Sequence, residues 1–495
     1  MKKTLLILVC VIAAWCQTVQ AQVERPKLVV GLVVDQMRWD YLYYFQDLYG
    51  EDGLKRLLHE GFSCENTMIP YLPTVTAIGH ASIYTGSTPA MHGMCGNNFF
   101  IKGKGVYCCE DDQVQSVGSD TKKGQMSPRL LLASTIGDQL KLATDFRSRV
   151  VGVAVKDRAA ILPAGHAADA AYWYDSDAHR FITSTYYMDA LPAWVEQFNK
   201  ENKKVLGGDL YNSPDGVTMT FRLAEQALKE YELGQRGETD MLAVSISATD
   251  AIGHKVGLRD TLLREAYKRL DTELAAFLRV LDSTVGKGQY LLFLSADHGA
   301  AHNYNFLKEH KIPAGGWESW SDLKRLRHLV AERFHAGEDI LAGESSNRFY
   351  LDHAKIAERG LQLQEVKQFV MDELKKNPDA LFVVDFADAA NATIPPLLRD
   401  RLCNGYHPDR AGDIIVVMRP QVVLTTNKPD FPGTSHGAWN PYDAHIPCVF
   451  MGWHIPQGAT SAPTAMTDIA PTVCELLHIQ MPNACIGTAI TAITQ

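Results

Sequence analysis

Six side chains are of the types that bind divalent metal ions, namely Asp35, Asp250, His254, Asp297, His298 and His436. Each aspartate follows an apolar segment, and two of the aspartates have a histidine within four positions. Taken singly, such residues are more typical of turns, helix caps and satisfied histidines. Imidazole nitrogens and carboxylate oxygens together are the ligands that zinc takes outside thiolate sites, although they do not exclude manganese or iron. The set therefore predicts a mixed Asp/His metal site.

A candidate nucleophile lies in the segment of residues 73–80, Pro-Thr-Val-Thr-Ala-Ile-Gly-His. The residues that follow are expected to open a helix, whose free amides and positive dipole end favour a bound oxyanion or phosphate. A threonine hydroxyl is a poor nucleophile at neutral pH unless a metal or base activates it. Both Thr74 and Thr76 offer such a hydroxyl.

The aspartates must be positioned by the apolar runs that precede them. Residues 27–34, 240–247 and 289–296 are nearly continuous apolar segments, which is typical of buried parallel strands. In open α/β sheets, sites are built at the carboxyl ends of such strands. A strong amphipathic helix is expected over residues 262–285, between two of these strands. This alternation predicts a doubly wound, mostly parallel α/β sheet flanked by helices.

Two further segments bear on the site. Residues 130–146 are expected to be helical, and residues 149–155 form a strand that leads into Lys156 and Arg158. These two cations are spaced to lie on one side of an extended chain. Residues 301–430 differ in pattern and are expected to form a cap or insertion within a catalytic domain that spans residues 22–495.

Residues 1–21 have the pattern of a cleaved signal peptide, with two lysines, an apolar stretch and a Val-Gln-Ala cleavage site. The apolar stretch is short for a transmembrane helix, so export to the periplasm or medium without a stable membrane anchor is expected. The net charge of −9 argues against a nucleic-acid-binding surface. The eight cysteines outside the signal peptide permit disulfides, whose pairing the sequence does not give, and are expected to be structural.

The order of these motifs resembles the alkaline phosphatase superfamily over nearly the whole mature chain. The matching features are a strand-terminal aspartate, Pro-Thr-x-Thr, Asp-x-x-x-His, Asp-His-Gly and Thr-x-His-Gly. Within the superfamily, the chain looks closest to exported bacterial phosphate monoesterases with a threonine nucleophile. The resemblance implies an alkaline phosphatase-like fold, a monomer and small-molecule phosphate monoesters as substrates.

The resemblance also implies a role for each candidate residue. Thr76 would attack phosphorus to give a covalent phospho-threonine, which water then hydrolyses, and Thr74 would serve in packing or capping. Two zinc ions would stabilise the entering and leaving oxygens. One zinc would be held by Asp250, His254 and His436, and the other by Asp35, Asp297 and His298 together with the hydroxyl of Thr76.

Three other residues would decide the substrate class. Asn97 matches an asparagine that hydrogen-bonds a phosphate oxygen in this branch, with Asn98 as its rival. Lys156 and Arg158 match a Lys-x-Arg pair that contacts the remaining charge of a monoester. Because a monoester carries two charges and a diester carries one, these cations favour the monoester.

Sibling families supply the alternatives. Sulfatases need Cys or Ser followed by a Pro-x-Arg context, which Thr76 and the residues after it do not provide. Phosphodiesterases and nucleotide pyrophosphatases share the threonine and the metal ligands but lack the Lys-x-Arg pair, so a phosphodiesterase is the second hypothesis. A non-catalytic exported binding protein is the third, although no ligand, nucleophile or cation of the set is missing.

Overall fold

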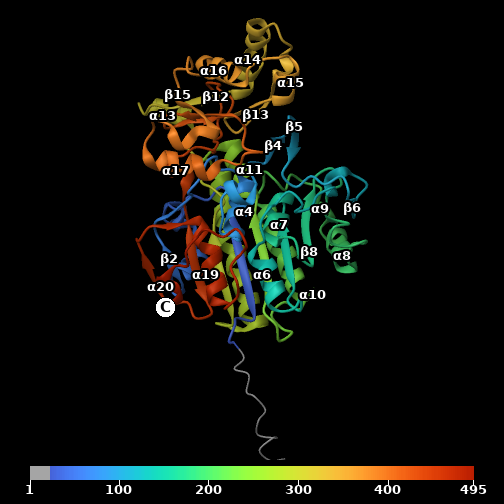
Figure 1. The fold of residues 1–495 in the computed structure, drawn as a ribbon. Coiled ribbons are helices and arrows are strands. Elements are labelled where there is room, and N and C mark those ends of the chain that lie inside the picture. The colour runs from blue at the N-terminus through green and yellow to red at the C-terminus, as the bar shows by residue number, and fades with distance from the viewer. Residues whose placement is uncertain (1–22) are drawn as a thin grey trace, which may run out of the picture.

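The computed structural model describes residues 23–495, so the predicted signal peptide lies outside the described residues. The main feature is a ten-stranded sheet with strand order β20-β2-β19-β11-β1-β10-β7-β8-β9-β6. Helices cover this sheet, as Figure 1 shows for α4, α6, α7 and α19. The predicted α/β class, with a large helix-flanked sheet, is confirmed.

Five parallel strands form the centre of the sheet. Every residue of the three strands that precede the candidate aspartates is buried, which explains their nearly continuous apolar sequences. In spatial order the five strands are β11 (Tyr290–Ser295), β1 (Leu28–Val34), β10 (Asp240–Ile246), β7 (Val150–Ala154) and β8 (Ala170–Asp175).

The outer strands make the whole sheet mixed. On one side, β19 (Cys448–Gly452) is antiparallel to both β11 and β2 (Phe62–Cys64), and β20 (Gly458–Thr460) is parallel to β2. On the other side, β9 (Arg180–Ser184) is antiparallel to both β8 and β6 (Ser116–Val117). The predicted parallel arrangement therefore holds for the centre of the sheet, where buried strands with covering helices identify it.

Helices outside residues 301–430 form two groups of mutually packed elements. One group comprises α4 (Thr76–Thr85), α6 (Ile136–Ala143), α7 (Asp157–Ala164) and α19 (Ile469–Leu476). The other comprises α3 (Leu54–Glu60), α10 (Asp215–Glu230), α11 (Ala248–Val256) and α12 (Thr261–Leu281). Within residues 23–495, no helix is both long and apolar enough to cross a membrane.

Helix α6 is shorter than the helix expected over residues 130–146. Its start is fixed by a capping box, in which the Thr135 hydroxyl accepts from the Asp138 amide and the Asp138 carboxylate accepts from the Thr135 amide. This reciprocal cap satisfies two amides that would otherwise lack partners, so the helix begins at Ile136 rather than earlier.

Residues 301–430 contain a second, smaller sheet with its own hydrophobic core. Its antiparallel strand order is β13 (Leu341–Ser345), β14 (Arg348–Leu351), β16 (Ile414–Met418) and β15 (Ala380–Asp385). Helices α14 (Ser319–Phe334) and α16 (Leu363–Leu374) accompany it, and Figure 1 shows this lobe above the main sheet.

Helix α4 packs unusually closely against the chain at the end of β11. A Cβ atom placed on Gly79 would lie 2.3 Å from the backbone oxygen of Asp297. Only glycine permits this approach, which brings the first turn of α4 to the carboxyl edge of the sheet.

We expect Gly79→Ala to lower the free energy of unfolding by about 2 kcal/mol, since overpacking a tight contact typically costs this much. The loss should occur even though alanine favours the helix over glycine by up to ~1 kcal/mol. Denaturant unfolding measures it, with Gly50→Ala as the control because a Cβ there meets its nearest atom at 3.6 Å. Equal stability of the two variants would contradict the close packing.

Candidate active site

Three aspartates meet at the carboxyl edge of the central strands. Asp35 directly follows β1, Asp250 lies in the first turn of α11 after β10, and Asp297 follows β11. Because β10, β1 and β11 are adjacent and parallel, the segments after them emerge side by side. All three side chains are buried, with at most 4% of their surface exposed.

Asp250, His254 and His436 form the first cluster of possible ligands, whose donor atoms lie within 4.8 Å of one another. His254 Nε2 is 3.1 Å from Asp250 Oδ1, and His436 Nε2 is 3.6 Å from the same oxygen. Asp250 and His254 are four residues apart in α11, so the helix places them on one face. His436 reaches them from a loop 182 residues further along the chain.

Asp35, Asp297 and His298 form the second cluster. His298 Nε2 lies 3.6 Å from Asp35 Oδ1 and 3.4 Å from Asp297 Oδ2. Donor atoms of Asp35, Asp250 and His298 also lie within 4.8 Å of one another, so Asp250 borders both clusters.

The three imidazole rings are oriented alike. In His254, His298 and His436, Nδ1 donates to a backbone carbonyl at 2.7 to 3.0 Å. This hydrogen bond places a proton on Nδ1 and turns Nε2 toward the carboxylates, the orientation of metal-bound histidines. Burial and the neighbouring His298 and His254 hold the pKa of His436 well below its usual value, which keeps this ring neutral.

Several polar atoms of the clusters lack a hydrogen bond within the described part of the chain. Asp35 Oδ1, Asp297 Oδ2 and His298 Nε2 are buried and make no hydrogen bond to any residue from 23 to 495. Burial and the nearby Asp35 carboxylate raise the pKa of Asp297 well above its usual value. A bound divalent cation would coordinate the unpaired lone pairs and offset the excess negative charge. The residues present therefore fit a metal.

Thr76 is the first residue of α4 and is 1% exposed. Among residues 23–495 its hydroxyl has no hydrogen-bond partner, whereas the Thr74 hydroxyl donates to the Ala438 carbonyl at 3.1 Å. The Thr74 carbonyl in turn accepts from His436 Nδ1, so this segment is tied to the first cluster. These contacts occupy Thr74 and leave Thr76 as the free hydroxyl of the pair.

Lys156 lies between the carboxylates. Its Nζ is 2.6 Å from both Asp35 Oδ2 and Asp250 Oδ2, and the side chain is buried. Arg158 is also largely buried, but the prediction that it shares an extended segment with Lys156 is wrong. Strand β7 ends at Ala154 and α7 begins at Asp157, so Arg158 lies in the first turn of a helix.

Asn97 lies beside the start of α4, because its Oδ1 accepts from the Ala77 amide at 2.9 Å. This bond leaves the Asn97 side-chain amide group free to donate. Its rival Asn98 is exposed and begins strand β4 (Asn98–Ile101). The structure thus brings the predicted asparagine, and not its neighbour, to the segment that contains Thr76.

Gln36 belongs to the site although the sequence pattern gave no sign of it beyond its place next to Asp35. Its backbone amide donates to Asp297 Oδ1 at 3.1 Å, and its side-chain amide donates to Asp250 Oδ1 at 2.6 Å. Its φ of 65° lies in the left-handed region, which non-glycine residues rarely adopt. Gln36 therefore links the aspartates of both clusters.

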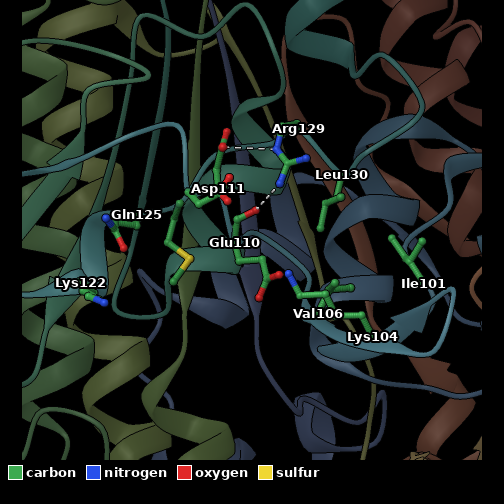
Figure 2. Close-up of a pocket in the computed structure, with 11 residues that line it drawn as sticks. Ile101, Lys104, Val106, Glu110, Asp111, Lys122, Gln125, Arg129 and Leu130 are labelled. Carbon is green, nitrogen blue, oxygen red and sulfur yellow. Dashed lines mark hydrogen bonds and ion pairs between the residues drawn. The ribbon is translucent and has the colours of Figure 1, made fainter. Parts of the chain in front are cut away.

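The surface hollow in Figure 2 is separate from these clusters. It is lined by the hairpin of β4 and β5 (Lys104–Tyr107) and by residues 110–130, and none of the predicted site residues lines it. Within it, Arg129 contacts Asp111 Oδ1 at 3.3 Å and donates to the Glu110 carbonyl at 3.2 Å.

Comparisons with known proteins agree with this geometry. The chain is 44% identical to a protein of Myroides odoratus named calcium-transporting ATPase, over 99% of this chain and 98% of that protein. It is 42% identical to alkaline phosphatase PafA of Elizabethkingia meningoseptica, over 95% of each chain. The crystal structure of wild-type PafA superposes with a TM-score of 0.91 at 41% identity, over 96% of this chain and 100% of that one.

Residues 29–439 match the family described as type I phosphodiesterase / nucleotide pyrophosphatase. This match covers most of the chain, and the relatives above are aligned over nearly their full lengths. The chain is therefore a member of the type I phosphodiesterase / nucleotide pyrophosphatase family, within the alkaline phosphatase superfamily.

Proposed function

We propose that the chain is an alkaline phosphatase, a metal-dependent hydrolase of small phosphate monoesters that acts through a covalent phospho-Thr76 intermediate. The observation that carries the proposal is the pair of adjoining ligand clusters at the sheet edge against which α4, the helix that begins with Thr76, is packed. The similarity to PafA, which is named an alkaline phosphatase, supports it.

Two zinc ions are the cofactors we propose. Asp250, His254 and His436 would hold one, and Asp35, Asp297 and His298, with Thr76, would hold the other. Two divalent ions in such a site supply stabilisation for both the entering and the leaving oxygen of an in-line displacement. Zinc is favoured over magnesium or calcium because the donor set includes three imidazoles.

The protein's own residues account for the remaining steps. Thr76 forms a bond from its hydroxyl oxygen to phosphorus as the bond to the ester oxygen breaks, and water then releases phosphate from the threonine. The first turn of α4 presents backbone amides to the negatively charged phosphoryl group. The free side-chain amide group of Asn97 donates to a phosphoryl oxygen, and burial around Thr76 limits access of bulk water.

Lys156 and Arg158 are proposed to select the monoester. Lys156 is buried between Asp35 and Asp250, and the side chain of Arg158 is largely buried beside Asp157, so both charges are weakly screened. A phosphodiesterase is the second candidate, which the family description itself favours. The two functions differ in the charge of the substrate, because a phosphate monoester carries two negative charges and a diester carries one.

We further propose that residues 1–21 are removed on export to the periplasm or medium and that the mature enzyme is a monomer. The lobe within residues 301–430 is proposed to serve as a cap, since Ser345 of β13 donates to the Asn98 carbonyl at 2.7 Å, next to Asn97.

The direct test compares kcat/KM on p-nitrophenyl phosphate and on its bis-ester for wild type and for Lys156→Ala/Arg158→Ala. We expect the wild type to prefer the monoester and the double variant to lose most of that preference, because two cations that match the second charge are gone. A wild-type preference for the diester would make the chain a phosphodiesterase. Activity on neither ester in zinc-replete protein would instead favour a binding protein.

We expect Gln36→Ala to weaken zinc binding by about 10-fold or more, since residues that orient ligands typically contribute this much to metal affinity. Competition with a zinc chelator measures the affinity without reference to turnover. Gln139→Ala is the matched control, because that buried glutamine donates to Ser134 and touches no candidate ligand. Equal zinc affinity in both variants would remove Gln36 from the site.

A further inference from the structure

We infer that Tyr107 is a positioning residue that holds the guanidinium of Arg158 in place and thereby supports discrimination between phosphate monoesters and diesters. The inference rests on the proposed function, in which Arg158 contacts the substrate, and adds a residue that the motifs did not include. Tyr107 is the last residue of strand β5 (Lys104–Tyr107).

The Tyr107 hydroxyl bridges an acid and a base. It donates to Asp157 Oδ1 at 2.6 Å and accepts from Arg158 Nη1 at 3.0 Å. The direct distance from Arg158 Nη1 to Asp157 Oδ1 is 3.8 Å, which is too long for a hydrogen bond. The hydroxyl is therefore the group through which the carboxylate orients the guanidinium.

The remainder of the Arg158 guanidinium is available to a ligand. Within residues 23–495, Nη1 is its only hydrogen-bonded nitrogen, and Nε is buried without a partner. A buried arginine with unpaired donors near a cluster of proposed phosphate-binding groups is arranged to bind an anion. Without the hydroxyl, no hydrogen bond from the described residues would fix the plane of that guanidinium.

The phenol is kept in the form that this role needs. Burial raises the pKa of Tyr107 well above its usual value, despite the opposing effect of Arg158, so the hydroxyl keeps its proton. A neutral hydroxyl can donate to the carboxylate while its lone pairs accept from the arginine. The same Asp157 Oδ1 also accepts from the Arg158 backbone amide at 2.7 Å, so this carboxylate is held at the start of α7.

The same hairpin end also holds Asn97. Tyr107 pairs with Asn98 across the β4–β5 ladder, and the amide of Cys108 donates to the Asn97 carbonyl at 3.0 Å. One rung of this hairpin therefore positions two of the groups that are proposed to bind the phosphate, Asn97 and Arg158. Along β5 the neighbouring Val106 faces the hollow of Figure 2, which is consistent with the alternation of side chains in a strand.

The test measures kcat/KM for p-nitrophenyl phosphate and its bis-ester in Tyr107→Phe, which keeps the ring and removes only the hydroxyl. We expect about a 10-fold loss on the monoester, the size typical of a lost hydrogen bond to a charged group, and a loss below about threefold on the diester. Tyr290→Phe is the control, since its buried hydroxyl donates to Asp282 at 2.8 Å from the first residue of β11, at the opposite edge of the sheet.

A double-mutant cycle separates positioning from general packing. In an Arg158→Ala background, Tyr107→Phe should cost less than about twofold on the monoester, because residues that act through one another are not additive. Equal losses on both esters, or the same loss with and without Arg158, would overturn the inference. If Tyr107→Phe does not fold, Asp157→Asn removes the charge that orients the hydroxyl and should give the same selective loss.

The outcome also separates this inference from the proposed function. A wild-type preference for the diester would overturn the proposed function. In that case, non-additive effects of the Tyr107 and Arg158 substitutions on kcat/KM for the preferred ester would support the positioning inference. Additive effects would overturn it.

Discussion

The repulsion among three buried carboxylates is the constraint on which the site depends. Asp35, Asp250 and Asp297 converge where water cannot screen them, and Lys156 is the cation in direct contact with two of the three. Like charges this close raise the pKa of one member or require additional positive charge. Burial and the nearby Asp35 raise the pKa of Asp297, and Asp35 Oδ1 and Asp297 Oδ2 accept no hydrogen bond within residues 23–495. Bound divalent cations would satisfy both features at once.

The order of the central strands and the packing of α4 make this convergence possible. The aspartates follow the carboxyl ends of three adjacent parallel strands and so lie at one edge of the sheet. Because these strands are buried, they hold the candidate ligands in fixed positions. The close contact between Gly79 and Asp297 fixes α4, and with it Thr76, over the same edge. The candidate nucleophile at a helix start, the candidate ligands at strand ends and the returning loop with His436 are therefore parts of one arrangement rather than separate motifs.

The parts of the site that follow from local chemistry could be predicted from the sequence. Strand-terminal aspartates, the four-residue spacing of Asp250 and His254, and the order of motifs all have a direct structural consequence. Contacts made across the fold could not be predicted in this way. Gln36 and Tyr107 act through hydrogen bonds to residues distant in sequence, and nothing in their immediate surroundings distinguishes them.

The position of Arg158 in a helix was missed because one residue decides whether a strand ends before or after a charged pair. The antiparallel outer strands are set by pairing partners, which apolar runs do not encode.

The most direct test of this account is anomalous X-ray diffraction from crystals of zinc-replete protein, with data collected on both sides of the zinc absorption edge. The account predicts two zinc peaks, one bounded by Asp250, His254 and His436 and the other by Asp35, Asp297 and His298. A single peak, no peak, or peaks outside these clusters would contradict the proposal that paired metal ions balance the buried carboxylates.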